Sequence, residues 1–127
     1  TIDIDGAHQR VARRVFTEAG IPSSRTRTIT GRALDVLPRL ADGAYDMLFL
    51  DGDPADYAAC VADAPRLLRS GGVLAMTGAY GRRTADITSR APDAVTIRDV
   101  VRSFRDDDRW HHALLPVGDG LLCAARA

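Results

Sequence analysis

Hydrophobic and polar residues recur with two different periods along the chain, and these periods predict alternating strands and helices. Thr1 to Asp5 alternates polar with apolar residues, which is typical of the end of a strand. Between about residues 7 and 19, apolar residues recur at i, i+4 and i+8, which predicts an amphipathic helix. Gly20 and then Pro22 end this helix.

The middle of the chain contains two further predicted strands. Residues 25–30 alternate and are rich in β-branched side chains, so they form the second predicted strand. Gly31 then turns the chain into a short helix that carries Pro38. Residues 44–50 are an almost continuous apolar run, which is typical of a parallel strand buried on both faces.

The second half repeats the alternation and ends in a hairpin. Asp53 is placed as an N-cap, with Pro54 at the first helical position. This helix is predicted to run to about Arg69, with a kink at Pro65. Ser70-Gly71-Gly72 opens the next strand. The remaining predicted elements are a strand at 73–76, a loop at 77–91, a helix at 93–105 and hairpin strands at 113–117 and 121–125.

This order of elements predicts an α/β fold with a mostly parallel sheet and an antiparallel pair at one edge. In such sheets, ligands bind at the carboxyl ends of the strands. Three of these ends carry polar residues or glycine, namely Asp3 to Asp5, Gly31 with Arg32, and Asp51 to Asp53. A carboxylate at a strand end accepts both hydroxyl hydrogens of a ribose, or it caps the next helix, and the pattern leaves both interpretations open.

Composition narrows the classes of function. The chain has 127 residues, a formal net charge of +0 and 46% hydrophobic residues, which is the balance of one globular domain. This charge leaves no footprint for nucleic acid, and no apolar run approaches the roughly 20 residues that span a bilayer. Cys60 and Cys123 lack a metal-binding spacing and favour a reducing compartment. We therefore expect a cytoplasmic protein without nucleic-acid or membrane partners.

Two residue types are absent, and their absence limits the chemistry. All 17 basic residues are arginine, and the chain contains neither lysine nor asparagine. Schiff-base lysines, phosphate-binding P-loop lysines and asparagine ligands are therefore excluded within these residues. Because Thr1 already lies inside a predicted strand, we expect the chain to be a fragment of a longer protein.

Five segments, in their order and spacing, resemble the class I S-adenosylmethionine-dependent O-methyltransferases related to catechol and caffeoyl-CoA O-methyltransferases and their bacterial relatives. The segments are TIDID, FTEAGI, ITGRALDVLPRLADGAYDMLFLDGDPADY, RLLRSGGVLA and LLPVGDGLL. The resemblance covers nearly the whole chain and implies a Rossmann-like methyltransferase sheet. It also implies S-adenosylmethionine as the cofactor and a hydroxyl of a small molecule as the methyl acceptor.

The resemblance also assigns a cofactor site, residue by residue. Asp3 matches the acid that binds the ribose. The segment that lies against the adenine is matched by Gly31, Arg32 and Ala33. The strand end beside the methionine moiety and the reaction centre is matched by Asp51, Gly52 and Asp53.

The chain departs from the family at the metal site and at the catalytic base. The family's metal-binding Asp-Asn pair falls on Thr77 and Gly78, which leaves Asp51 as the only family ligand. One carboxylate provides too few oxygen ligands for a hard cation, so we expect no divalent metal site. The lysine base of many relatives falls on Pro54. Asp53 is the carboxylate that we assign as the base, although a helix cap explains it equally well.

The family's first strand and its Gly-rich loop, which holds the methionine end of the cofactor, have no counterpart in the chain. We therefore expect residues 1–127 to form a single, partial methyltransferase domain whose central strand is missing. The slot between the flanking strands is closed by their direct pairing, by another chain or by a further part of the same protein. We expect the fragment to bind cofactor weakly or not at all, and the protein to form a homodimer.

The loop over residues 77–91 contains further candidates. Tyr80 is a candidate for lining the acceptor pocket. Arg82, Arg83 and Arg90 fit either an acidic substrate or a solvated loop, and both interpretations stay open.

Two further polar clusters lie before the hairpin. His111 and His112 follow Trp110, and neighbours on a strand face opposite sides, so they cannot both serve one site. Surface roles and one active-site base stay open for them. Asp106 to Asp108 fits a solvated turn or a cation site.

The residues and the resemblance together predict an O-methyltransferase, as the parent of an inactive fragment. The first alternative is a methyltransferase-like domain that binds cofactor or partners without catalysis, because the metal pair and the lysine are missing. The second is a nicotinamide-dependent oxidoreductase, since a strand-end acid such as Asp3 binds ribose in both classes. The absence of a G-x-G-x-x-G segment argues against this second alternative.

Overall fold

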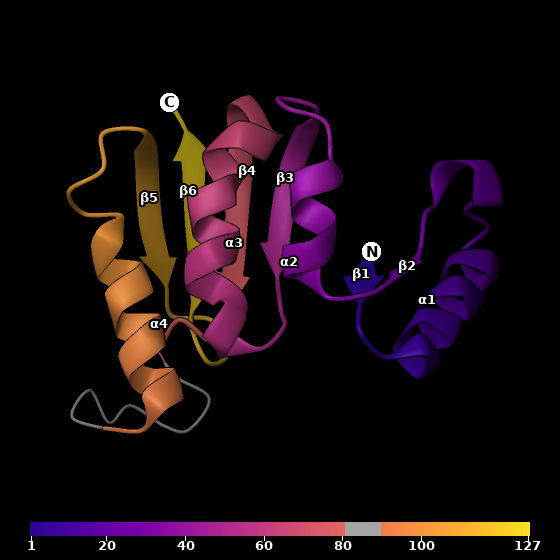
Figure 1. The fold of residues 1–127 in the computed structure, drawn as a ribbon, viewed down its shortest axis with the longest axis horizontal. Coiled ribbons are helices and arrows are strands. Elements are labelled where there is room, and N and C mark those ends of the chain that lie inside the picture. The colour runs from indigo at the N-terminus through magenta and orange to yellow at the C-terminus, as the bar shows by residue number, and fades with distance from the viewer. Residues whose placement is uncertain (81–89) are drawn as a thin grey trace. The chain divides into compact units, whose positions relative to one another are not determined.

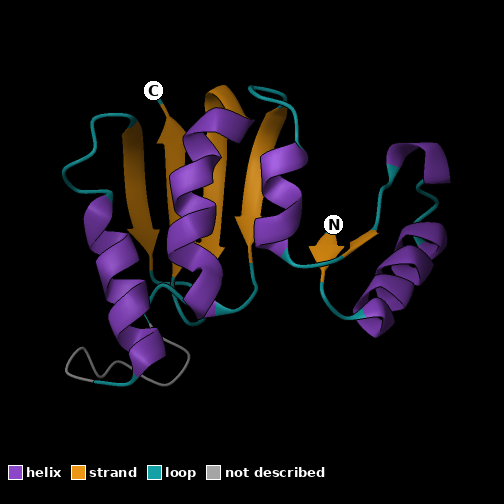
Figure 2. Ribbon diagram, in the orientation of Figure 1, coloured by secondary structure: helices purple, strands orange, loops and turns teal. Residues whose placement is uncertain are grey.

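The computed structural model describes residues 1–80 and 90–127, in which strands and helices alternate (Figure 1; Figure 2). The chain divides into two compact units, Thr1–Arg39 and Leu40–Ala127. Each unit has its own sheet, of two and of four strands. The assignment of the whole chain to a single, partial domain remains a prediction.

In the first unit, a helix connects two short parallel strands. Strand β1 (Ile2–Asp3) pairs with β2 (Ile29–Thr30), and Ile2 lies opposite Ile29. Helix α1 (Gly6–Glu18) lies between them in sequence and begins where the carboxylate of Asp5 accepts a hydrogen bond from the amide of Ala7, at 2.7 Å. The predicted first strand and helix are confirmed. The N-cap at Asp5 starts the helix where the apolar pattern with helical spacing begins.

The predicted strand over residues 25–30 is wrong for residues 25–28. Ser23–Arg25 forms a 3₁₀ turn, η1, and only Ile29–Thr30 pairs as a strand. The amide of Arg25 donates to the carbonyl of Pro22, at 2.9 Å, which closes the turn. The turn thus engages the backbone amide of Arg25, which the alternating sequence pattern alone assigned to a strand.

Helix α1 is held to the strands by a buried amide rather than by its apolar stripe. The Nε2 group of Gln9 donates to the carbonyls of Thr1 and Ile29, at 3.2 and 2.9 Å. Gln9 is 1% exposed, whereas Val11 and Val15 of the predicted stripe are 49% and 50% exposed. The two-residue strands of this unit offer too little apolar surface to cover that stripe.

The first unit ends in a short helical segment, as predicted. Helix α2 (Ala33–Val36) continues into the 3₁₀ turn η2 (Leu37–Arg39). The change to 3₁₀ geometry coincides with Pro38, which has no amide to continue the α-helical pattern.

The second unit is a mixed sheet of four strands in the order β3-β4-β6-β5. Its strands are β3 (Tyr45–Leu50), β4 (Leu68–Thr77), β5 (Trp110–Leu115) and β6 (Leu121–Arg126). The β3–β4 pair is parallel, and the β4–β6 and β5–β6 pairs are antiparallel. This arrangement confirms the predicted parallel sheet with an antiparallel hairpin. The hairpin begins earlier than predicted, because Trp110, His111 and His112 already pair with β6.

Two helices cover one face of this sheet, α3 (Pro54–Leu67) and α4 (Pro92–Ser103) (Figure 1). The core between them and the sheet contains Tyr57, Cys60, Leu67, Leu74, Met76, Ile97, Val100, Phe104, Trp110 and Leu122. The rings of Phe104 and Trp110 meet edge to face with centroids 5.5 Å apart. The other face is less covered, since Met47 and Phe49 of β3 are each 55% exposed.

A bulge in β4 displaces the predicted boundary between helix and strand. Tyr45 lies opposite Leu68 and Met47 lies opposite Val73, so β4 uses three more residues than β3 over this stretch. Helix α3 therefore ends at Leu67 rather than near Arg69, and the strand begins before the glycines. Gly71, with φ of 73°, provides the left-handed conformation that the bulge requires.

Strands β1 and β3 lie in separate sheets, and each pairs with only one other strand among the described residues. How the slot beside these strands is closed remains a prediction. Among the described residues, no helix combines the length and the apolar character needed to cross a membrane.

Candidate functional site

The carboxylate of Asp3 is the first candidate group, at the carboxyl end of β1. Its Oδ1 atom accepts a hydrogen bond from the amide of Asp5 at 2.7 Å, and its Oδ2 atom lies 3.0 Å from Nδ1 of His8. The bond from the Asp5 amide has the largest effect and lowers the pKa of Asp3. Burial opposes it, and the hydrogen bond and charge of His8 add smaller effects that lower the pKa further. Its side chain is 35% exposed, so an ionised acceptor faces the solvent at this strand end.

The predicted adenine segment begins beside Asp3. The amide of Gly31 donates to the carbonyl of Asp3 at 2.9 Å, so the two strand ends meet. Arg32 is the N-cap residue of α2, and Ala33 is its first residue. The structure thus brings Asp3 and the segment from Gly31 to Ala33 together within one unit, as expected for groups on neighbouring parallel strands.

The second unit carries a strand-end pair of its own. The hydroxyl of Thr77 donates to Oδ1 of Asp51 at 2.6 Å and lies 3.3 Å from the carbonyl oxygen of Leu50. The pair forms because β3 and β4 are parallel, with Leu50 opposite Met76, so the next residues of both strands meet. Sequence reasoning treated Thr77 only as a missing metal ligand and did not predict this bond.

The residues after Asp51 lead into helix α3. The hydroxyl of Tyr57 donates to the carbonyl of Gly52 at 3.3 Å, which holds the turn against a side chain that is 3% exposed. The carboxylate of Asp53 accepts from the amide of Ala55 at 3.0 Å. The predicted N-cap is therefore confirmed, and a role of this exposed carboxylate as a base remains a prediction.

Tyr80 follows β4 and lies against the hairpin turn. Its amide donates to the carbonyl of Asp119 at 2.9 Å, and the amide of Ala79 donates to that of Gly120 at 3.1 Å. The ring passes so close to Gly120 that a Cβ there would lie 2.5 Å from Cδ2 of Tyr80. The ring is 45% exposed, so part of it is available to a ligand, as the prediction of an acceptor pocket requires.

The donor set at Asp51 does not fit the family's metal. Thr77 offers a neutral hydroxyl that is already bonded to Asp51, and Gly78 has no side chain. Among the residues described, no three His, Cys, Asp or Glu side chains gather closely enough to hold a metal ion. A hard dication takes six or more oxygen ligands, several of them usually carboxylates.

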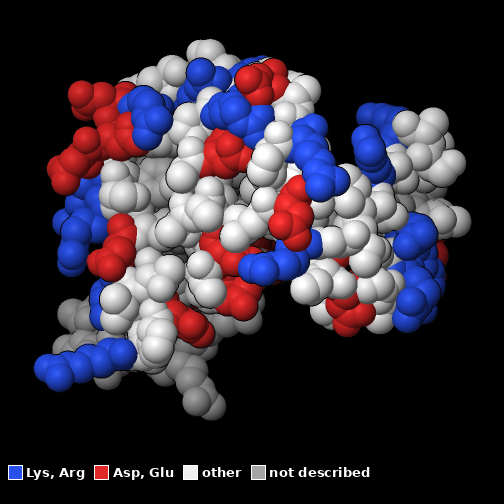
Figure 3. Space-filling model, in the orientation of Figure 1, with Lys and Arg blue, Asp and Glu red and all other residues white. Residues whose placement is uncertain are grey.

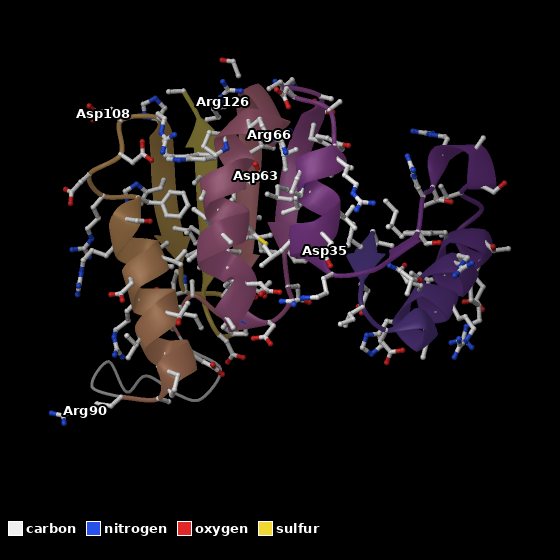
Figure 4. The ribbon with its side chains drawn as sticks, viewed as in Figure 1. Asp35, Asp63, Arg66, Arg90, Asp108 and Arg126 are labelled. Carbon is white, nitrogen blue, oxygen red and sulfur yellow. The ribbon has the colours of Figure 1, made fainter. Side chains whose placement is uncertain are left out.

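The remaining sequence candidates are the acidic turn, the two histidines before the hairpin turn and the arginines after β4. Asp107 is paired with Arg109, whose Nη2 atom lies 2.7 Å from Oδ2, and this contact lowers the pKa of Asp107. The ring of His112 lies 6.2 Å from that of Phe104. Arg90 is exposed and lies at the edge of the view in Figure 4. Arg82 and Arg83 lie outside the described residues.

One depression on the second unit, of about 620 Å³, is lined by β4, β5 and β6. Its lining includes His111 and His112 but neither Asp51, Asp53 nor Tyr80. It is therefore a feature of the sheet surface and not of the strand ends.

Sequence reasoning missed two residues beside Asp3. His8 contacts its carboxylate, and Gln9 joins Thr1, which precedes the strand of Asp3, to Ile29 of β2. A signal exists for His8, because the first turn of a helix that follows a strand directly returns toward that strand's end. A buried glutamine in the polar part of the pattern carries no such signal by itself.

The fold defines the class of the protein. Parallel strands joined by helices, with an antiparallel hairpin at the end of the chain, form an α/β Rossmann-like methyltransferase fold. The chain belongs to the O-methyltransferase family, whose model matches residues 1–127.

Curated relatives agree with this family. The Mycobacterium tuberculosis protein named Probable O-methyltransferase Rv1220c is 49% identical over 127 residues, which are 99% of this chain and 57% of that protein. A relative from Mycobacterium sp. strain KMS, also named as an O-methyltransferase, is 47% identical and is covered over 58% of its length. The chain thus spans somewhat more than half the length of the curated relatives that it matches.

Solved structures show the same fold. A protein from Corynebacterium glutamicum matches with a TM-score of 0.90 and 38% identity, over 99% of this chain and 59% of that one. The O-methyltransferase TomG from Streptomyces achromogenes, crystallised in complex with SAM, matches with a TM-score of 0.85 over 100% of this chain and 60% of that one. TomG is 23% identical, so its likeness concerns the fold alone.

Proposed function

We propose that the full-length protein transfers a methyl group from S-adenosylmethionine to a hydroxyl of a small molecule. The observation that carries this proposal is Asp3, an ionised, partly exposed carboxylate at the end of β1 and beside Gly31, in a chain of the O-methyltransferase family. A vicinal diol needs two acceptors side by side, and a carboxylate provides them. The crystal structure of TomG with SAM supports the choice of cofactor.

The groups of the chain divide between binding and proton transfer. Asp3 holds the ribose, the segment from Gly31 to Ala33 lies against the adenine, and Asp51 with Gly52 lies beside the methionine end. In the reaction the bond from methyl carbon to sulfur breaks and a bond from that carbon to the acceptor oxygen forms. The hydroxyl proton passes to a base, for which we propose Asp53. Positioning of the two reactants accounts for most of the rate.

The proposed reaction uses no divalent cation. The bond from Thr77 to Asp51 supports this, because it engages the only family ligand that the chain retains. Substitution of Thr77 and Gly78 for the family's Asp-Asn pair removes the other two. Turnover of a catechol-type acceptor by the full-length protein is therefore expected to survive EDTA, and a strict Mg²⁺ requirement would contradict the proposal.

Calorimetry of the full-length protein tests the cofactor. We expect S-adenosylhomocysteine to bind and NAD to give no heat. Binding of NAD in place of S-adenosylhomocysteine would favour the nicotinamide-dependent alternative. The Asp3→Asn variant tests the role of Asp3, because it keeps the size of the side chain and removes its charge. It is expected to weaken binding of S-adenosylhomocysteine by about tenfold.

A cofactor-binding domain without catalysis is the second candidate function. The specific observation in its favour is that neither the family's lysine nor its metal pair exists in this chain. Tight binding of S-adenosylhomocysteine without turnover of any hydroxyl acceptor would support this alternative. Methyl transfer that falls in the Asp53→Asn variant would support the enzyme.

We further propose a homodimer that binds neither nucleic acid nor membrane. Acidic and basic side chains are interspersed over the face of Leu40–Ala127 seen in Figure 3, in keeping with the formal net charge of +0. A single-sign patch of the kind that binds a phosphate backbone is absent from the described residues on that face. Light scattering of the full-length protein, with and without added nucleic acid, tests both statements.

A further inference from the structure

The orientation of the Asp3 carboxylate is set by two contacts from the segment that follows it. One is the amide of Asp5, two residues on, which donates to Oδ1 at 2.7 Å. The other is the imidazole of His8, whose Nδ1 atom lies 3.0 Å from Oδ2. An ionised carboxylate only accepts hydrogen bonds, so Nδ1 of His8 carries the hydrogen in this contact. Each oxygen of Asp3 is therefore held by a different donor.

The position of His8 follows from the way that α1 begins. Asp5 caps the helix through the amide of Ala7, and His8 completes the first turn. This turn brings the imidazole back to the end of β1, between two carboxylates. Its Nε2 atom is 4.0 Å from Oδ2 of Asp5, which is too long for a hydrogen bond. The close contact of His8 is thus with Asp3 alone of the two.

The contacts leave acceptor capacity on both oxygens of Asp3. Each carboxylate oxygen has two lone pairs, and one on each is used by the chain. The two that remain belong to different oxygens of a carboxylate whose rotation is blocked from both sides. Such a group is prepared to accept two hydroxyl hydrogens from neighbouring carbons, without the entropy loss of ordering it during binding.

We propose that His8 is a positioning residue for cofactor binding, which orients Asp3 toward the 2′ and 3′ hydroxyls of the ribose. This inference rests on the function proposed above, since it assumes that Asp3 binds a ribose. His8 does not itself contact the ligand; it acts through Oδ2 of Asp3. Its side chain is 69% exposed and its ring has no role in a core, so its contact with Asp3 is what a substitution removes.

The test measures binding of two ligands to variants of the full-length protein by calorimetry. The ligands are S-adenosylhomocysteine and its 2′,3′-dideoxy analogue, which lacks the hydroxyls in question. The variants are His8→Ala, which removes the donor, and His8→Asn, whose amide nitrogen takes nearly the place of Nδ1. Arg14→Ala is the matched control, because it removes an exposed side chain of the same helix that pairs with Glu18.

We expect His8→Ala to weaken binding of S-adenosylhomocysteine by about 3- to 10-fold, the usual effect of one hydrogen bond. His8→Asn is expected to restore binding to within about twofold, and Arg14→Ala to leave it unchanged. The dideoxy analogue is expected to bind His8→Ala and the unsubstituted protein equally. A structural role of His8 would weaken both ligands alike.

Three results overturn the inference. The first is a His8→Ala variant that binds S-adenosylhomocysteine as tightly as the unsubstituted protein does. The second is an equal loss of affinity for both ligands, and the third is a loss that His8→Asn does not recover. If the unsubstituted protein binds no S-adenosylhomocysteine, the proposed function fails and the role of His8 fails with it, so the two failures are distinguished by the first measurement.

Discussion

At the scale of single residues, the space around a glycine determines the contact between Tyr80 and the hairpin turn. Gly120 has a φ of 90°, and a Cβ there would lie 2.5 Å from Cδ2 and 2.8 Å from the amide nitrogen of Tyr80. Both the backbone conformation and the lack of room therefore require glycine.

Gly120→Ala is expected to destabilise the protein by about 2–3 kcal/mol, because it combines a strained backbone with a clash. Urea unfolding followed by circular dichroism measures this loss. Gly118→Ala is the matched control in the same turn, since its φ is 54° and nothing lies within 4 Å of the added Cβ. That control is expected to cost about 1 kcal/mol. Equal losses would show that Tyr80 does not restrict the site.

The acidic turn before β5 gives a prediction on pH. Arg109 lowers the pKa of Asp107 in the folded protein, chiefly through side-chain hydrogen bonds. A carboxyl group with a lowered folded pKa stabilises the protein above its unfolded pKa, near pH 4, and this stabilisation is lost as pH falls through the folded value. Asp107→Asn is therefore expected to be less stable than the unsubstituted protein at pH 7, and the difference is expected to shrink below pH 4.

Unfolding at a series of pH values checks this expectation. Asp108→Asn is the control, because it removes the same charge one residue away at an exposed position. A difference for Asp107→Asn that stays constant down to pH 2 would contradict the assigned ion pair.

The same residues show what the sequence could predict at this scale. The N-cap role of Asp53 was predictable, because capping depends only on neighbours in sequence. The bond from Thr77 to Asp51 was not predicted, since it depends on the register between two strands, and the pairing of Asp107 with Arg109 was one of many that a charged turn allows. Contacts between neighbours in sequence are therefore easier to predict than contacts that depend on the register between two strands.

At the scale of elements, the bulge of β4 explains why the boundary near residue 70 was misplaced. The glycines were interpreted as the start of a strand, whereas Leu68 already pairs with Tyr45. Gly72 is enclosed by the strand, and a Cβ there would lie 2.8 Å from the carbonyl oxygen of Arg69 and 3.1 Å from that of Tyr45. Glycine marks an interruption of regular structure, but it does not show whether the interruption lies before or inside a strand.

Gly72→Ala is expected to reduce stability by about 1–3 kcal/mol, because the backbone atoms around it cannot move aside. Hydrogen exchange should report faster exchange of the amides of β3 beside the bulge. Gly52→Ala is the control, since its φ is not in the left-handed region and nothing lies within 4 Å of an added Cβ. A stability loss for Gly72→Ala that is no larger than the loss for Gly52→Ala would contradict the assigned close contact at Gly72.

Arg66 joins α3 to the loop before β3. It lies beside Asp63 on the helix, as Figure 4 shows, with Nη2 2.9 Å from Oδ2, and it donates to the carbonyl of Leu40 at 2.9 Å. The hydrogen bond to Asp63, followed by the one to Asp42, raises the pKa of Arg66 above its ordinary value. Sequence pattern predicted the helix and the strand, but not the side chain that connects them.

At the scale of the whole molecule, the candidate groups are divided between two units. Asp3 and Gly31 belong to Thr1–Arg39, whereas Asp51 and Asp53 belong to Leu40–Ala127. The alternation of strands and helices and the hairpin at the end of the chain follow from the sequence pattern and the resemblance. How a cofactor site is completed does not, because the chain spans 57% of a curated relative such as Rv1220c.

We expect residues 1–127 alone to bind S-adenosylhomocysteine more weakly than the full-length protein does. The physical reason is that the family's Gly-rich loop for the methionine end has no counterpart among these residues. Calorimetry on both proteins side by side measures the difference, and circular dichroism checks that the shorter chain is folded. A dissociation constant near 1 µM for residues 1–127 would contradict this expectation.

The rate at which the buried thiol of Cys60 is labelled measures local opening of the second unit. Burial, followed by the nearby charges of Asp56 and Asp63, raises the pKa of Cys60, and the side chain is 3% exposed on α3. The thiolate is the group that reacts with alkylating reagents, and burial keeps Cys60 both protonated and out of reach. Labelling of Cys60 therefore requires helix α3 to detach from the sheet. The half-buried Cys123 on β6 provides an internal reference in the same molecule. The ratio of the two labelling rates therefore reports how often this helix opens, and no residue has to be introduced for the measurement.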